Sequence, residues 1–149
     1  MTGRARKKNF IARYSMKKLN CVLLVDDDGA TNFINYRIVK QLDITEEIHT
    51  EFNGEKALNY IQYYAERHDN HGPELILLDL KMPVLDGYEF MEYLRLKKFS
   101  NKDKMSVLVL SSGGGKDDME RLLRHNVRYI AKPLTAECLT EALGIKHCL

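Results

Sequence analysis

A short apolar segment that ends on a carboxylate constrains this sequence most. Residues 75–78 are four consecutive apolar residues, Asp79 follows them directly, and Pro83 comes four positions later. A continuous apolar run closed by a turn residue predicts a strand buried on both faces, as in a parallel sheet. Such a strand would deliver Asp79 to its carboxyl end, where parallel sheets carry their binding and catalytic groups.

Two other apolar segments end in the same way. Residues 21–25 run into the aspartates at 26–28, and residues 107–110 run into the serines at 111–112. Because the carboxyl ends of parallel strands meet at one edge of a sheet, we expect these polar groups to form one site with Asp79.

The remaining segments complete an alternation of strands and helices. We expect strands at 20–25, 47–52, 75–79, 105–110 and 127–131, and helices at 29–42, 54–65, 87–97, 117–125 and from Thr135 to 143. Strands separated by single helices, five times over, require a parallel sheet with helices on both faces. Residues 47–52 alternate polar and apolar side chains, which predicts an edge strand.

Local signals mark the helix faces and ends. In the first helix, the expected inward face consists of apolar residues four apart: Ala30, Ile34, Ile38 and Leu42. Asp86 with Glu89, and separately Thr135, have the types and spacing of residues that begin helices.

Length and cysteine content indicate one intracellular domain. A chain of 149 residues can bury a core without disulfides. Cys21, Cys138 and Cys148 have no framework spacing, so we expect reduced cysteines that serve as packing residues. The sequence has neither an apolar run long enough to cross a membrane nor a secretory signal, which predicts a cytoplasmic protein without a membrane partner.

The net charge of +2 conceals a basic segment at the N-terminus. Residues 1–15 hold five of the 23 basic residues and no acid, which leaves 18 basic against 21 acidic residues. We interpret residues 1–17 as a basic, disordered leader and residues 18–149 as the folded domain. A contact of this segment with nucleic acid or anionic lipid is the alternative. Nucleic acid is not favoured, because Phe10 is the one aromatic residue among the charges before residue 14 and no DNA-reading helix is recognisable.

The carboxylates at the strand ends call for a cation. Asp26, Asp27 and Asp79 in one cleft would repel one another unless positive charge lay between them. Oxygen ligands of this kind suit Mg²⁺, and no histidine or cysteine near these strand ends points to zinc. Lys132 follows the fifth strand and could reach the cleft, although a lysine before proline is often only a surface charge. Carboxylate, Mg²⁺, ammonium and the hydroxyl of Ser111 are the groups that phosphoryl transfer requires.

These residues carry a family resemblance. Leu24-Val-Asp-Asp-Asp28, Asp79-Leu-Lys-Met-Pro-Val-Leu-Asp-Gly87, Ser111-Ser112 and Lys132-Pro133 resemble the receiver domain of two-component response regulators, over about residues 18–146. The resemblance implies a flavodoxin-like (βα)5 three-layer sandwich with a five-stranded parallel sheet of order 2-1-3-4-5. It also implies that Asp79 accepts a phosphoryl group, with Mg²⁺, from a sensor histidine kinase or a histidine phosphotransfer protein.

The same resemblance implies a role for each site residue. Asp27 would ligate Mg²⁺ directly and Asp26 through water, while Asp79 offers a carboxylate oxygen and Lys81 its backbone carbonyl. Ser111 and Lys132 would contact the phosphoryl group.

Two neighbouring positions have competing interpretations. Tyr129 matches the aromatic residue that turns inward on activation in the family, and the alternative is a half-exposed strand residue. Asp28 falls just after the acidic pair, and we interpret it as the cap of the first helix.

We therefore expect a stand-alone signalling receiver without an output domain, which catalyses only its own phosphorylation and dephosphorylation. Its unknown protein target would bind the face of the fourth helix, fifth strand and fifth helix, with homodimerisation as a further possibility; a solvated charged face is the alternative there. The competing function is a Mg²⁺-dependent phosphohydrolase with an aspartyl nucleophile. Such an enzyme would carry an acid two residues after the nucleophile, and this sequence has Lys81 there.

Overall fold

The computed structural model describes residues 17–67, 72–97, 104–113 and 115–145. Almost all of the expected leader, residues 1–17, lies outside these ranges, as does Cys148. Within them, no helix is both long enough and apolar enough to cross a membrane.

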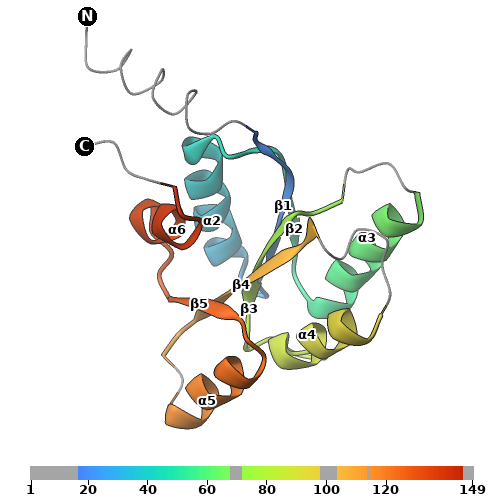
Figure 1. The fold of residues 1–149 in the computed structure, drawn as a ribbon, viewed down its shortest axis with the longest axis vertical. Coiled ribbons are helices and arrows are strands. Elements are labelled where there is room, and N and C mark those ends of the chain that lie inside the picture. Colours follow the sequence, from blue (N-terminus) through green and yellow to red (C-terminus); the bar gives the residue numbers. More distant parts are fainter. Residues whose placement is uncertain (1–16, 68–71, 98–103, 114, 146–149) are drawn as a thin grey trace, which may run out of the picture.

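The chain alternates strands and helices along its length, as Figure 1 shows. The strands are β1 (Leu19–Val25), β2 (Thr45–Glu51), β3 (Leu75–Asp79), β4 (Ser106–Ser111) and β5 (Arg128–Ala131). The helices are α2 (Gly29–Leu42), α3 (Gly54–Arg67), α4 (Gly87–Leu96), α5 (Lys116–Arg124) and α6 (Ala136–Ala142). The strands form one parallel sheet of order β2-β1-β3-β4-β5, which confirms the predicted flavodoxin-like topology.

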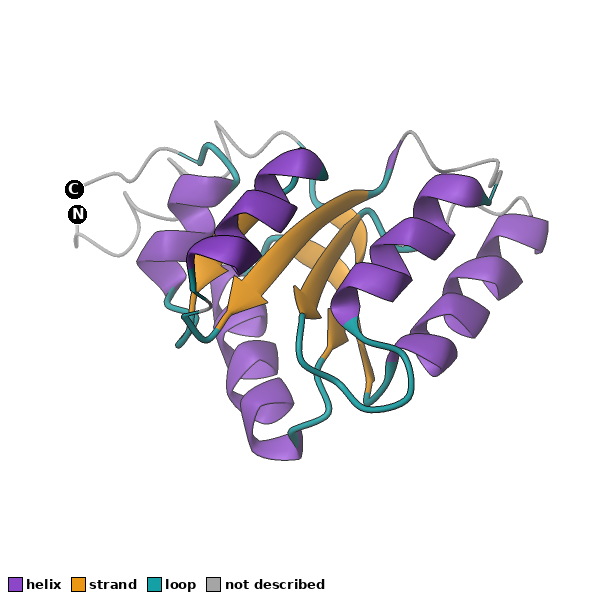
Figure 2. Cartoon of the chain, turned by 90° about the horizontal axis from the view of Figure 1, so that it is seen from below, coloured by secondary structure: helices purple, strands orange, loops and turns teal. Residues whose placement is uncertain are grey.

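Helices cover both faces of the sheet, so the molecule has three layers (Figure 2). Helices α3, α4 and α5 pack with one set of strand side chains, and α2 and α6 pack with the alternate set. All five residues of β3 are buried, because this central strand has helices on both sides. Strand β2 lies at the edge and contains no fully buried residue, as its alternating sequence predicts.

The inward face of α2 agrees only in part with the predicted one. Asn32, Asn35 and Val39 are buried, whereas Ile34 is 55% exposed and Ala30 is also exposed. Ile38 and Leu42 pack against the core as predicted, so the prediction was wrong only for Ala30 and Ile34, where it followed apolar spacing alone. The helix instead turns two amides inward, and one of them, Asn32, bonds backbone carbonyls at the ends of β1 and β2.

Three helices begin at the residues that the sequence indicates. Asp28 accepts a hydrogen bond from the backbone N–H of Ala30, Asp86 from that of Glu89, and Thr135 from that of Cys138. Each side chain satisfies a backbone donor that has no partner within its own helix. The predicted cap at Asp28 is therefore confirmed.

The cysteines are only partly as expected. Cys21 is fully buried in β1, as predicted, but Cys138 of α6 is exposed and is not a packing residue. The helix turns Leu139 and Thr140 inward instead, which leaves Cys138 facing away from the core.

Gly87 is expected to be intolerant of any side chain. A Cβ there would lie 2.7 Å from the carbonyl oxygen of Asp79 and 2.8 Å from the Cα of Leu80, both backbone atoms. Gly87→Ala should lower the free energy of unfolding by about 1–3 kcal/mol, the usual cost of overpacking. Gly115→Ala is the control, because a Cβ there meets nothing within 4 Å. Urea unfolding measures both changes, and equal stability of the two variants would contradict the expectation.

Candidate functional site

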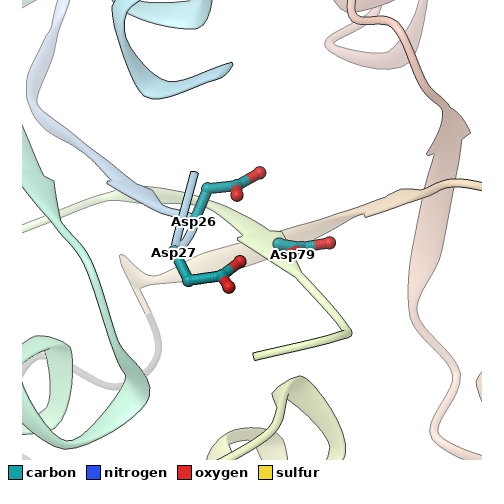
Figure 3. Close-up of side chains that lie close together, drawn as sticks. All are labelled: Asp26, Asp27 and Asp79. Carbon is teal, nitrogen blue, oxygen red and sulfur yellow. The ribbon is translucent and has the colours of Figure 1, made fainter. Parts of the chain in front are cut away.

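Three carboxylates meet at the carboxyl edge of the sheet (Figure 3). Val25 of β1 pairs with Leu78 of β3, so the next residues, Asp26 and Asp79, emerge side by side. Asp26, Asp27 and Asp79 each place a carboxylate oxygen within 4.8 Å of the others. Asp26 and Asp79 are buried and Asp27 is exposed, so the group opens to solvent on the Asp27 side.

Lys132 lies between two of these carboxylates. Its Nζ is 2.9 Å from Oδ2 of Asp26 and 3.0 Å from Oδ1 of Asp79, and its side chain is 22% exposed. The ammonium reaches this position because β5 ends beside β4, where the backbone N–H of Lys132 bonds the carbonyl of Ser111. Lys132 is thus part of the site and not a surface charge.

Burial and pairing act in opposite directions on these groups. Burial raises the pKa of Asp79, and the hydrogen bond from Lys132 opposes this rise while repulsion from Asp26 adds to it. For Lys132, burial lowers the pKa, but the hydrogen bonds to both aspartates outweigh it and raise the pKa above its usual value. The ammonium therefore stays charged, and Asp79 is more basic than an ordinary aspartate, which favours its use as a nucleophile.

The polypeptide around Asp26 is held by hydrogen bonds. Oδ1 of Asp26 accepts the backbone N–H of Asp28, and the amide of Asn32 donates to the carbonyl of Asp26 at 2.8 Å. The same Asn32 amide is 3.4 Å from the carbonyl of Glu51, so it joins the ends of β1 and β2. Asn32 is not among the site residues predicted from the sequence; a polar residue one turn into a helix that begins at an acidic cluster is the signal that could have identified it.

Ser111 lies on the strand between Asp79 and Lys132. Asp79 pairs with Leu110, so Ser111 is one residue further along β4, and its side chain is buried. Its Oγ is 3.4 Å from the backbone N–H of Gly113. The predicted phosphoryl contacts thus lie at the ends of the next two strands: Ser111 ends β4, and Lys132 directly follows β5.

Lys81 and Asp28 adjoin this centre, and Tyr129 lies on β5. The backbone N–H of Lys81 bonds the carboxylate of Asp79, and the Lys81 side chain is exposed. Tyr129 of β5 is 39% exposed, so in this structure it is the half-exposed strand residue. The Asp28 carboxylate caps α2 and bonds the hydroxyl of Thr31 at 2.6 Å.

The donor set fits a small divalent cation. All three ligand candidates offer oxygen, two of them are buried, and their spacing lets one ion contact more than one carboxylate. Hard cations such as Mg²⁺ prefer such ligands and retain waters at the open positions. The exposed side, at Asp27, leaves room for those waters.

A family model for the response regulator receiver domain matches residues 22–144. The chain belongs to this family. Receiver domains are signalling domains that interact with histidine kinases or phosphotransfer proteins.

Curated relatives of this receiver include regulatory proteins. It is 31% identical over 122 residues to a probable methanogenesis regulatory protein, FilR2, of Methanothrix harundinacea, an alignment that covers 79% of this chain and 75% of FilR2. The receiver spans about half the length of the next curated relatives it matches.

Solved structures share the receiver fold. A two-component response regulator from Cytophaga hutchinsonii has a TM-score of 0.75 and 30% identity, covering 86% of this chain and 96% of that one. The receiver domain of the sensor histidine kinase PA1611 from Pseudomonas aeruginosa has a TM-score of 0.66 over 85% of this chain and 95% of its own, and that structure holds magnesium in its active-site cleft. At 24% identity, the PA1611 likeness shows the fold alone.

Asp79→Asn is expected to raise the free energy of unfolding at neutral pH when no divalent metal is present. Burial raises the pKa of Asp79, so its ionised form opposes folding above that raised pKa. The difference between the variant and the wild type should shrink as the pH falls below 3.8, the ordinary aspartate value, because both states of the wild type are then protonated. Urea unfolding in a chelator at neutral and acid pH measures this difference. A less stable Asp79→Asn at neutral pH would contradict the expectation.

Proposed function

We propose that this receiver accepts a phosphoryl group on Asp79 from a phosphohistidine of a sensor kinase or phosphotransfer protein. An Oδ of Asp79 forms the new bond to phosphorus while the nitrogen–phosphorus bond of the donor breaks. The electron pair of that bond returns to the imidazole, which takes up a proton. The single observation that carries the proposal is the buried, basic Asp79 paired with the ammonium of Lys132. A kinase that draws on ATP operates in the cytoplasm, so the proposal includes that location.

The residues next to Asp79 have proposed roles in binding Mg²⁺. Asp27 would ligate Mg²⁺ directly and Asp26 through water, with Asp79 and the carbonyl of Lys81 completing the protein ligands. When bound, Mg²⁺ supplies positive charge that offsets the negative charge of the transferring group.

Lys132 and Ser111 would bind the phosphoryl oxygens of the acyl phosphate. The ammonium of Lys132 already touches Asp79, and the hydroxyl of Ser111 can donate from the neighbouring strand. Because Ser111 leads into α5 and Tyr129 lies on β5, a movement of Ser111 towards the new acceptor would change the surface that α5 and β5 form. Tyr129 turning inward is the proposed companion of that movement.

Exposed apolar side chains near the site favour a protein as phosphodonor. Phe33 of α2, Phe52 after β2 and Val84 after β3 are 62%, 49% and 86% exposed. Val84 also has a φ of 70°, a backbone conformation that β-branched residues rarely adopt. Since Asp79 is buried, a donor must place its histidine against this edge, and apolar side chains there offer contact area to a protein.

The proposed partner face is the surface of α5, β5 and α6. A groove of about 600 Å³ runs there, lined by Tyr129, Ile130, Cys138 and neighbouring residues. An open groove beside an edge strand can accept a downstream protein or a second copy of this chain. The identity of that partner, and the activity of a whole protein that includes this receiver, are part of the proposal.

The competing function, a Mg²⁺-dependent phosphohydrolase, has less support. Its general acid would stand two residues after Asp79, where Lys81 offers an ammonium and no carboxylic acid. Steady turnover of a phosphomonoester would favour the hydrolase, and one stoichiometric, alkali-labile phosphate would favour the receiver.

Incubation with Mg²⁺ and acetyl phosphate is expected to add one phosphoryl group to the wild-type chain. Intact mass spectrometry measures the gain, and Asp79→Asn should show none because it lacks the nucleophilic oxygen. Asp27→Asn should react far more slowly at the same Mg²⁺ concentration. Equal modification of wild type and Asp79→Asn would contradict the proposed function.

Lys81→Asn is expected to shorten the half-life of the acyl phosphate. The Lys81 side chain is exposed next to the site, where its ammonium can pair with phosphoryl oxygens and limit the approach of water. An exposed ion pair of this kind contributes roughly a threefold change in rate. Loss of the phosphoryl group over time by intact mass measures it, with Lys56→Asn on α3 as the control. An unchanged half-life would contradict this role.

A further inference from the structure

Helix α5 is the most weakly packed helix on its face of the sheet. Of its nine residues Leu122 alone is buried, whereas α3 and α4 each bury five. Figure 1 shows α5 at the end of the molecule beside β5. Few buried apolar contacts mean low local stability, so α5 can change position at small cost.

Open space lies on both sides of the end of α5. One cavity of about 250 Å³ is bounded by Met91 and Leu94 of α4 and by His125, which follows α5. The groove of about 600 Å³ on the other side is bounded by Leu123 and Tyr129. A helix between two cavities has room to shift without overpacking.

Tyr88 of α4 contacts the inner face of α5. The hydroxyl of Tyr88 lies 3.1 Å from Oδ1 of Asp118, and the guanidinium of Arg121 lies 3.9 Å from the centroid of the Tyr88 ring. The ring of His125 lies 6.3 Å away, centroid to centroid. These three residues share one helical face with Leu122, and we call them, with Tyr88, the Tyr88 cluster.

Tyr88 is also fixed to the turn that follows the phosphoacceptor. Its neighbour Gly87 donates its backbone N–H to the carbonyl of Leu80, and there is no space for a Cβ at Gly87 against Asp79 and Leu80. Tyr88 itself is 8% exposed. The backbone at Asp79 and Leu80 is thus in close contact with the residue that precedes Tyr88.

From this we propose that Tyr88 is a positioning residue: by holding Asp118 and Arg121, it keeps α5 in the resting position and so opposes phosphorylation of Asp79. The inference rests on the proposed function. The phosphorylated state draws Ser111, and with it the start of α5, towards the site. Contacts that hold α5 in the resting state must break or rearrange for that movement. The free energy of these contacts therefore weakens the binding of a phosphoryl group at Asp79.

Beryllofluoride, which binds an aspartate carboxylate as a phosphoryl mimic, tests this in the full chain with Mg²⁺. Tyr88→Phe removes the hydroxyl and keeps the ring, and should lower the dissociation constant for beryllofluoride by roughly 3- to 10-fold, since the lost bond is to a charged group. The initial rate of phosphorylation by acetyl phosphate should be higher for Tyr88→Phe than for the wild type. Calorimetry measures the dissociation constant, and intact mass spectrometry over time measures the rate.

Matched variants separate positioning from general stability. Tyr93→Phe makes the same change at a half-exposed tyrosine of α4 and should leave the dissociation constant unchanged. Asp118→Ala should act like Tyr88→Phe, whereas Asp117→Ala, at the preceding exposed position, should not. A merely structural role would lower the free energy of unfolding without tightening beryllofluoride binding, so urea unfolding of all four variants is measured alongside.

The outcomes distinguish this inference from the function it rests on. If wild type binds beryllofluoride but Tyr88→Phe and Asp118→Ala bind it no more tightly than their controls, the positioning role is wrong. Weaker binding by both variants would also overturn it, because the cluster would then stabilise the phosphorylated state. If wild type neither binds beryllofluoride nor gains a phosphoryl group, the proposed function fails and this inference fails with it.

Discussion

The ion pairs of Lys132 with Asp26 and Asp79 are the interaction on which the site depends. Burying two carboxylates beside a third would be strongly unfavourable without a positive charge within contact distance. The ammonium, 2.9 and 3.0 Å from the two oxygens, supplies that charge, and its own raised pKa shows that the pairing outweighs its burial. Removing it would leave buried charge uncompensated, which costs more than the pairs themselves contribute.

The topology of the sheet makes those ion pairs possible. Lys132 and Asp26 are 106 residues apart in the chain and meet because β1 and β3 are neighbours while β4 and β5 continue the sheet on one side. The strand order reverses direction at β1 and β3, which is where open α/β sheets form their binding crevices. Each strand delivers its polar residue to the same edge because all neighbours are parallel.

Packing around the site is uneven, and this matters for signalling. On the Asp26 side, Asn32 bonds the ends of two strands, so the acidic pair is held firmly. On the Ser111 side the chain enters α5, which has one buried residue and polar contacts to Tyr88. A rigid reaction centre next to a weakly held helix is an arrangement in which a local change of charge can alter a distant surface.

The sequence by itself determined the order of elements, the helix caps at Asp28 and Thr135, and the strand ends that carry Asp79, because these signals act within a few residues. Only the tertiary structure decided that α2 buries Asn32 and exposes Ile34, and that Tyr88 contacts α5. Both depend on which strand ends and helices lie opposite, and apolar spacing along one helix carries no information about hydrogen-bonding groups on its neighbours.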